Sequence, residues 1–398
     1  MSAARWRRAM NGSAAAARGG RGSMVVPVPS LPRGAGAAAP APAVAWWRRA
    51  LSAIRLRHLL VLVFVVGYPF VATPFFTFQI GAQSLALGLI ALSLTFLGGY
   101  GGMISLAQTA LMGISGYMVG NMVTKGGAGG ETKGLTLGWD PSLAIVAAIV
   151  ITIVIGLAFG ALASRSFGIY FLMLTLVYAV IANTFFGSVT QFGGFSPIAG
   201  VNRYTPGFIG DMVNDRTRLY YIALIVSVFV YVMVRFVLRT PFGLSLQGVR
   251  DEPIRMGSLG FNVPVHRMLA FAFGAFIAAL SGVLFVWWQG QIAPGDIGLA
   301  ATIQLLVMSV IGGLTRIEGA WLGALAVLLI DNQVTNRIPS EGLPVIGGSF
   351  NTVIGLVFLA IVIVSPDGLL GIWDRLWAIA RHRRDPEEPA LAVSQANQ

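Results

Sequence analysis

A short polar segment, residues 244–267 (LSLQGVRDEPIRMGSLGFNVPVHR), interrupts the apolar chain, and long apolar stretches flank it on both sides. Only 11% of the whole chain is charged. The charged or titratable side chains of the segment are Arg250, Asp251, Glu252, Arg255, His266 and Arg267. A polar island of both charge signs in an apolar chain indicates a docking point for a soluble partner.

The sequence offers little for covalent or metal chemistry. It has no cysteine, which excludes disulfides, thiolate chemistry and cysteine-ligated metals. Its three histidines, His58, His266 and His382, are far apart in the sequence and form no cluster with metal-ligand spacing. A P-loop needs Gly-Lys before Ser or Thr, whereas Lys125 and Lys133 both follow threonine. We therefore expect no cofactor or metal and no enzyme activity in this chain, and any ATP hydrolysis belongs to another chain.

The composition places the chain in the membrane. It has 398 residues, of which 56% are hydrophobic, and soluble domains carry about a quarter charged residues. Repeated apolar runs approach the ~20 residues that a helix needs to cross a bilayer. Runs such as 144–163 are apolar at nearly every position, unlike the alternating strands of a membrane barrel. The fold class predicted is an all-α, polytopic helix bundle of about ten transmembrane or partly re-entrant helices.

The chain divides into three predicted parts. Residues 1–57 form a basic tail, rich in Ala, Gly, Pro and Arg, which we expect to be disordered. Residues 58–372 form the transmembrane domain, and residues 373–398 form a C-terminal tail. The predicted spans have approximate limits 58–78, 81–98, 103–123, 141–163, 168–186, 219–238, 268–289, 298–314, 318–336 and 348–366.

The distribution of basic residues predicts the orientation. Short cytoplasmic loops are enriched in Lys and Arg, and a cytoplasmic N-terminus puts most of the 27 basic residues on that side. Both termini and the polar segment are then cytoplasmic, and the protein is a multi-pass membrane protein in contact with lipid. This arrangement explains the net charge of +12 without a nucleic-acid partner. No span has a charge near its middle, which argues against an ion-coupled carrier.

A glycine-rich segment, residues 97–117 (LGGYGGMISLAQTALMGISGY), is a candidate for the wall of a pathway. Four glycines in five positions should break a helix, and a break within the membrane is tolerated where it lines a cavity or is buried in protein. A plain loop, and ordinary hydrogen bonding between helices for the polar residues, are the alternatives. The candidate pathway-lining residues are Gly98, Gly99, Gly101, Gly102, Ser105, Gln108, Thr175, Asn183 and Gln304. Residues 310–323 repeat the Gly-Gly start weakly.

The polar segment itself predicts a short helix within a loop of about 240–267. Pro253 suits the first turn of a helix, and Asp251 or Glu252 would stand at its positive end. Gly260, with Asn262 just beyond, is a plausible stop. The alternative is a solvated connection, although connections rarely need about 25 residues.

These segments resemble the LivM-type permease of branched-chain amino acid ABC importers, over about residues 58–375. The motifs that carry the resemblance occur in the family's order: LGGYGGMISLAQTALMGISGY (97–117), SRSFGIYFLMLTL (164–176), TQFGGFSPIAG (190–200), GVRDEPIRMGSLGFNVPVHRMLAF (248–271), LLVMSVIGGLTRIEGAWLGALAV (305–327) and SPDGLLGI (365–372).

The resemblance implies that the chain is the permease subunit, in the bacterial inner membrane, of an ATP-driven importer for branched-chain or other hydrophobic amino acids. It implies a LivH-like second permease, two ABC ATPase subunits that hold ATP and Mg, and a periplasmic substrate-binding protein. Residues 248–262 would be the helix that couples to the ATPases. Arg250, Asp251 and Gly260 match the family's pattern there, Glu252 and Arg255 lie beside them, and Pro253 and Gly257 depart from it. The sequence leaves open a urea, short-amide or sugar importer, a stand-alone secondary carrier, and a scaffold for the tail.

Overall fold

The computed structural model describes residues 66–69, 73, 76–124, 134–207, 210, 216–337, 355, 359 and 368–371. The predicted tails 1–57 and 373–398 lie outside the described residues, as do most of the predicted spans 58–78 and 348–366.

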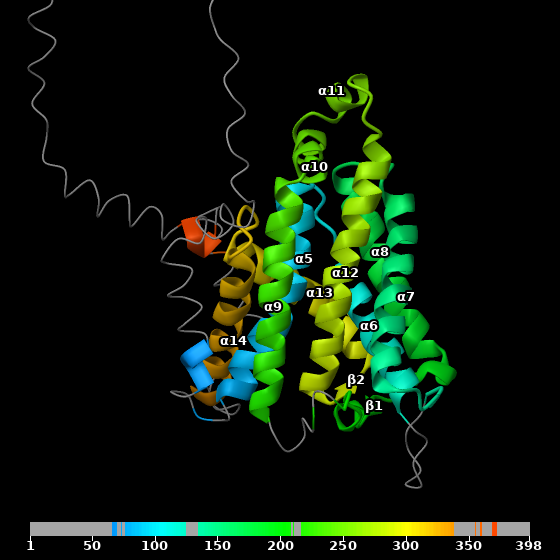
Figure 1. Cartoon of the computed structure of the whole chain (residues 1–398), viewed down its shortest axis with the longest axis vertical. Helices are drawn as coiled ribbons and strands as arrows, with labels where there is room; N and C mark the ends of the chain where they lie inside the picture. Colours follow the sequence, from blue (N-terminus) through cyan, green and yellow to red (C-terminus); the bar gives the residue numbers. More distant parts are fainter. Residues whose placement is uncertain are drawn as a thin grey trace, which may run out of the picture. The chain divides into compact units, whose positions relative to one another are not determined.

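The described chain is a bundle of helices (Figure 1). Each predicted span from 81–98 to 318–336 corresponds to one of them. The helices are α5 (Gln83–Thr95), extended by the π-helical turns η1 (Thr77–Ala82) and η2 (Phe96–Tyr100), α6 (Gln108–Val123), α7 (Pro141–Ala163), α8 (Ile169–Ser188), α9 (Arg216–Arg239), α10 (Pro241–Asp251), α11 (Pro253–Ser258), α12 (Val263–Gln289), α13 (Leu299–Gly312) and α14 (Gly319–Arg337). Short 3-10 turns η3 (Thr190–Phe192), η4 (Val201–Arg203) and η5 (Pro294–Ile297) lie in the connections.

Five of the described helices are long and apolar enough to cross a membrane: Thr77–Tyr100, Pro141–Ala163, Ile169–Ser188, Thr217–Arg239 and Val263–Gln289. Helix α13 has 14 residues, and at a rise of about 1.5 Å per residue it is about 21 Å long. That is shorter than a hydrocarbon core of ~30 Å, as expected of a partly re-entrant helix. The prediction of an all-α, polytopic membrane bundle is confirmed.

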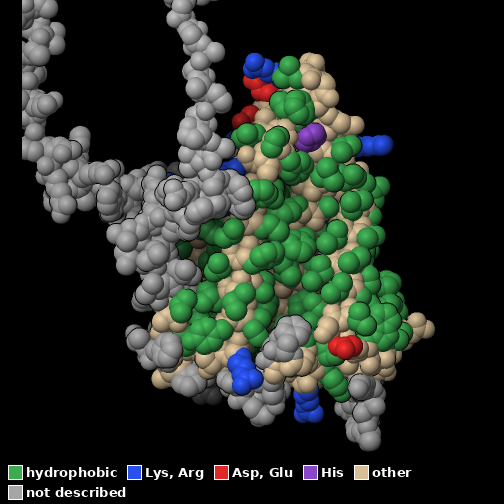
Figure 2. All heavy atoms as spheres, in the orientation of Figure 1, with side chains coloured by type: hydrophobic (Ala, Val, Ile, Leu, Met, Phe, Trp, Pro, Cys, Tyr) green, Lys and Arg blue, Asp and Glu red, His purple; other side chains and the backbone are tan. Residues whose placement is uncertain are grey.

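The two ends of the bundle differ (Figure 1). Helices α10 and α11 lie at one end, called here the loop end. At the other end, called the strand end, the two-residue strands β1 (Ile198–Ala199) and β2 (Gln291–Ile292) pair antiparallel. Figure 2 shows one face of the molecule, where hydrophobic side chains cover the middle and the charged side chains gather at the two ends.

Several helices begin at the same sequence signal, a capping side chain followed by proline. Asp140, Thr240 and Asn262 stand at the N-caps of α7, α10 and α12, and each side chain accepts a hydrogen bond from a backbone N–H of the first turn. Each helix also has proline at its first or second position, where a missing N–H costs nothing. Caps of this kind contribute about 1 kcal/mol each.

Helix α12 is the centre of the core, packed against α5, α6 and α7. Small residues make this packing close. A Cβ added at Gly282 would lie 2.2 Å from the carbonyl oxygen of Met112 in α6, and one at Gly156 would lie 2.2 Å from the Cβ of Ala275. The backbones of these helices therefore approach to a distance that only glycine allows.

Candidate functional site

The polar segment forms two consecutive helices at the loop end. The predicted short helix is present as α11, which begins at Pro253 with Glu252 at its N-cap and is followed by Gly260 at φ +91°. Asn262, expected near the stop, instead caps α12: its side chain accepts from the N–H of Val265 at 3.3 Å.

Helix α10 was not predicted, because the sequence analysis placed residues 240–252 in a loop. Its signal is Thr240 followed by Pro241: the Thr240 hydroxyl accepts from the N–H of Gly243 at 3.4 Å. Leu246 and Val249 are buried on the inner face of α10, which packs on α9, α12 and the end of η2. The helix is therefore part of the folded bundle and not a solvated link.

Helix α11 projects beyond the rest of the bundle (Figure 1), and apolar side chains on it and just after it are exposed. Ile254 is 86% exposed and Leu259 is 67% exposed. Arg255 and Glu252 lie 4.0 Å apart as an exposed ion pair, which contributes little to stability. Exposed apolar residues on a short helix outside the membrane bundle are typical of a contact surface for another protein.

The predicted glycine-rich break lies at the loop end. Gly98 and Gly99 remain in the π-helical turn η2, and the helix ends at Gly101 and Gly102, which has φ +65°. The N–H groups of Gly101 and Met103 both donate to the carbonyl of Leu97, at 3.1 and 2.9 Å. We call residues 98–102 the glycine turn.

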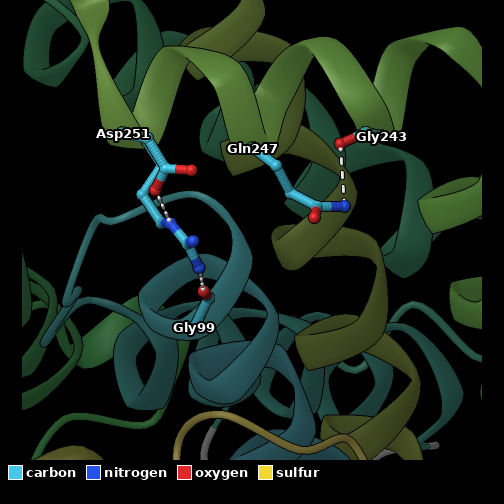
Figure 3. Close-up of polar contacts among 5 residues, drawn as sticks. Gly99, Gly243, Gln247 and Asp251 are labelled. Carbon is cyan, nitrogen blue, oxygen red and sulfur yellow. Dashed lines mark hydrogen bonds and ion pairs between the residues drawn. The ribbon is translucent and has the colours of Figure 1, made fainter. Parts of the chain in front are cut away.

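Arg250, near the C-terminus of α10, joins the polar segment to the glycine turn. Its Nη1 donates to the carbonyl oxygen of Gly99, and its Nε donates to Asp251 Oδ1 at 2.7 Å. Figure 3 shows this chain of contacts from Asp251 to Gly99, beside the hydrogen bond from Gln247 to Gly243 within α10. The structure thus brings together two segments that are about 150 residues apart and that the sequence marked separately.

The glycine turn also meets the second glycine segment, residues 310–323. A Cβ at Gly99 would lie 2.0 Å from the carbonyl oxygen of Leu314, and the hydroxyl of Tyr100 donates to the carbonyl of Thr315 at 3.4 Å. The turns that follow α5 and α13 are therefore in direct contact.

Three of the other candidate residues form one buried cluster. Ser105, Gln108 and Thr175 are fully buried. The hydroxyl of Ser93 donates to Gln108 Oε1 at 2.7 Å, Gln108 Nε2 donates to Ser105 Oγ at 3.4 Å, and the N–H of Leu106 donates to Thr175 Oγ1 at 3.1 Å. These hydrogen bonds tie α5, α6 and α8 together.

Asn183 and Gln304 lie apart from that cluster. Both side chains are half-buried, Asn183 on α8 and Gln304 on α13. These two helices are in contact, and Asn183 Nδ2 would lie 3.9 Å from a Cβ built at Gly298, at the N-terminus of α13. They are the more accessible of the polar candidates.

Sequence reasoning gave no site role to Arg267, which is only 4% exposed. It donates to the carbonyls of Ser164 at 3.0 Å and Ser166 at 2.6 Å, and its Nε lies 3.1 Å from the sulfur of Met103. Its guanidinium also lies 4.3 Å from the ring centre of Phe167. The start of α12 is thereby fastened to the turn between α7 and α8. An arginine beside an apolar helix was the sequence signal, but its hydrogen-bond partners are between 101 and 164 residues away in the sequence.

A second network missed by sequence reasoning joins α9 to the second glycine segment. The hydroxyl of Tyr231 donates to Glu318 Oε1 at 2.8 Å, and Arg235 Nη1 donates to the oxygen of Tyr231 at 2.7 Å. Within the part of the chain that the structure describes, no group of three or more His, Cys, Asp or Glu could hold a metal ion.

Comparison with known proteins identifies the family of this chain. Residues 76–365 match the model of the branched-chain amino acid transport system / permease component family. The chain is 27% identical over 189 residues to the high-affinity branched-chain amino acid transport permease LivM of Salmonella typhimurium, which covers 46% of this chain and 40% of the relative. It is 25% identical over 295 residues to BraD of Pseudomonas aeruginosa, covering 71% and 91%.

The chain is also similar to proteins named LivH. The chain is 26% identical over 162 residues to a probable LivH permease of Methanocaldococcus jannaschii, which covers 38% of this chain and 50% of the relative. No solved structure matches the chain. The family model covers most of the chain and nearly all of its described helices, so the chain belongs to the branched-chain amino acid transport system permease component family.

Proposed function

We propose that this chain is the membrane subunit of an ATP-driven importer that carries branched-chain or other hydrophobic amino acids into a bacterial cell. The family and the names of LivM, BraD and LivH support the transport system and its substrate class. The observation that supports the mechanism is α11, a helix outside the bundle on which Ile254 is exposed and which the exposed Leu259 follows directly. A permease without a nucleotide site of its own needs such a surface to receive force from ATPases.

The complex we propose contains a LivH-like second permease, two ABC ATPase subunits that bind ATP and Mg, and a periplasmic substrate-binding protein. The loop end and both termini face the cytoplasm. Arg250, Asp251, Glu252, Arg255 and Gly260 belong to the segment that meets an ATPase. We propose that Asn183 and Gln304 face the pathway, which is supported by their half-buried polar side chains on two helices that are in contact.

Uptake of radiolabelled leucine in cells with and without this gene tests the substrate. We expect deletion to abolish uptake, and excess valine to compete for it, whereas urea and ribose should not. Uptake unchanged by deletion, in cells without another leucine system, rules out the amino-acid assignment. Competition by urea or ribose would move the substrate to those classes.

The docking surface is tested by exchanging exposed apolar residues for serine. We expect Ile254→Ser with Leu259→Ser to reduce by about tenfold or more the ATPase that copurifies with the tagged chain, since central apolar contacts dominate protein interfaces. Ile169→Ser is the matched control, because Ile169 is 65% exposed at the start of α8 and lies outside α11. Full copurification of the double variant would remove α11 from the interface.

The pathway is tested by comparing an accessible residue with a buried one. We expect Asn183→Ala to change the leucine concentration needed for half-maximal uptake without altering thermal stability. Gln108→Ala should lower stability instead, because it removes buried hydrogen bonds worth about 1 kcal/mol each. If Asn183→Ala leaves the concentration dependence of uptake unchanged, Asn183 does not face the pathway.

A further inference from the structure

The guanidinium of Arg250 points into the bundle although its side chain is 38% exposed. Its Nη1 donates to the carbonyl of Gly99, which lies in η2 near the end of the helix formed by α5 and η2. Asp251 binds its Nε at 2.7 Å and so holds the planar group in position. A charged donor makes a stronger hydrogen bond to a carbonyl than a neutral one does. The contact therefore joins α10 to the backbone of the glycine turn and not to a side chain that could rotate away.

The glycine turn is shaped to receive this side chain. A Cβ at Gly102 would lie 2.5 Å from Cγ of Arg250, and the φ of +65° at Gly102 disfavours any other residue. The alkyl stem of Arg250 thus lies directly against the backbone at Gly102. The fit includes both the polar end and the apolar stem of the arginine.

Met103, which directly follows the glycine turn, is held by a second arginine, Arg267. Met103 contacts Arg267 through its sulfur, and Arg267 is itself fixed by the carbonyls of Ser164 and Ser166. Arg267 is buried, whereas Arg250 is partly exposed on a helix next to α11. One arginine therefore anchors this part of the chain to α7 and α12, and the other links it to the helix that leads to α11.

We propose that Arg250 is a positioning residue that acts inward: it carries a displacement of α10 and α11 to the glycine turn, and through the Gly99–Leu314 contact to the turn between α13 and α14. The inference rests on the proposed function, because it assumes that a partner displaces α11. It differs from a docking role, in which Arg250 would bind the ATPase.

The first test separates inward action from docking. We expect Arg250→Gln to lower leucine uptake by about tenfold or more, as the loss of a charge-assisted hydrogen bond predicts, while the copurifying ATPase and its ATP hydrolysis are retained. Arg165→Gln is the matched control, since Arg165 is exposed on the turn between α7 and α8, outside the segment that meets the ATPase, and the variant should keep the ratio of uptake to hydrolysis. Uptake and copurification that fall together in Arg250→Gln would overturn the proposal in favour of docking.

The second test replaces the contact by a covalent bond. A Cβ at Gly102 lies 3.4 Å from Cβ of Arg250, close to the separation of about 3.5–4.5 Å in disulfides. The chain has no cysteine, so Gly102→Cys with Arg250→Cys forms one defined pair, and Gly102→Cys alone controls for the strain of a side chain at φ +65°. We expect the reduced double variant to hydrolyse ATP without uptake, and oxidation to restore uptake to within about threefold of wild type. The wild-type complex under the same redox treatment controls for cysteines of its partners.

The outcomes separate this inference from the proposed function. A disulfide that forms but leaves uptake abolished shows that the two segments must separate, and overturns the inference. A wild-type complex that takes up neither leucine, urea nor ribose counts against the proposed function. In that case the disulfide yield of the double cysteine variant, measured with and without ATP plus vanadate, decides the inference. Equal yields support a contact between residues 102 and 250 that persists when nucleotide binds. A yield that falls sharply with nucleotide overturns the inference.

Discussion

At the scale of the residue, Arg267 shows how a charge is accommodated inside an apolar bundle. Burying a charge is costly unless it is compensated. The carbonyl of Ser164, the C-cap residue of α7, is one of its acceptors, and the C-terminus of a helix carries partial negative charge. The rings of Phe167 and Phe171, at 4.3 and 5.3 Å from the guanidinium, add cation–π attraction.

Replacing Arg267 should therefore weaken the fold itself. We expect Arg267→Met to lower the free energy of unfolding by about 2–3 kcal/mol, because the hydrogen bonds of a charged group are lost. Thermal unfolding of the detergent-solubilised chain, followed by light scattering or tryptophan fluorescence, measures it. Arg165→Met is the control, since Arg165 stands on the same turn with its side chain exposed. Equal melting temperatures for the two variants would contradict the role of Arg267 as an anchor.

At the scale of the element, the contact between α6 and α12 depends on the absence of a side chain. A Cβ at Gly282 would meet the carbonyl of Met112 at 2.2 Å, a backbone atom that cannot rotate away. We expect Gly282→Ala to force the two helices apart and to cost about 1–3 kcal/mol of stability, as overpacking does. The midpoint of thermal unfolding measures the loss.

A glycine in open space provides the comparison for Gly282. No atom lies within 4 Å of a Cβ built at Gly257, which is in α11. Alanine favours helix over glycine by about 1 kcal/mol, so Gly257→Ala should be neutral or slightly stabilising. A destabilisation as large as that of Gly282→Ala would mean that helix packing is not the cause.

The elements also show which parts of the fold could be predicted from the sequence and which could not. Spans such as 141–163 could be placed to within a few residues, because an apolar run bounded by Asp140-Pro141 determines both the helix and its start. Helix α10 was missed because it has few apolar residues, and because it is stabilised by packing on α9, α12 and η2, which are distant or separate elements that its own sequence does not reveal. The pairing of β1 with β2 and the contact of Arg250 with Gly99 were missed for a different reason: both join segments far apart in the chain, and no local pattern encodes them.

At the scale of the whole molecule, the two ends of the bundle carry unequal positive charge. The described arginines at the loop end are Arg165, Arg235, Arg239, Arg250, Arg255, Arg267 and Arg316, and those at the strand end are Arg203, Arg216, Arg218 and Arg337. Basic residues are retained on the cytoplasmic side during insertion. The charge asymmetry therefore favours a cytoplasmic loop end, the orientation that the proposed contact with ATPases requires.

Cysteine labelling can test this orientation cleanly, because the chain has no cysteine of its own. Gly257 at the loop end and Gly207 near the strand end are a matched pair: both are exposed, and no atom lies within 4 Å of an added Cβ. We expect a membrane-impermeant maleimide to label Gly207→Cys in intact spheroplasts, and to label Gly257→Cys only after permeabilisation. The reverse pattern would place α11 outside the cell, where no ATPase could reach it. Since both substitutions leave the core untouched, a difference in labelling reports the side of the membrane and not a difference in folding.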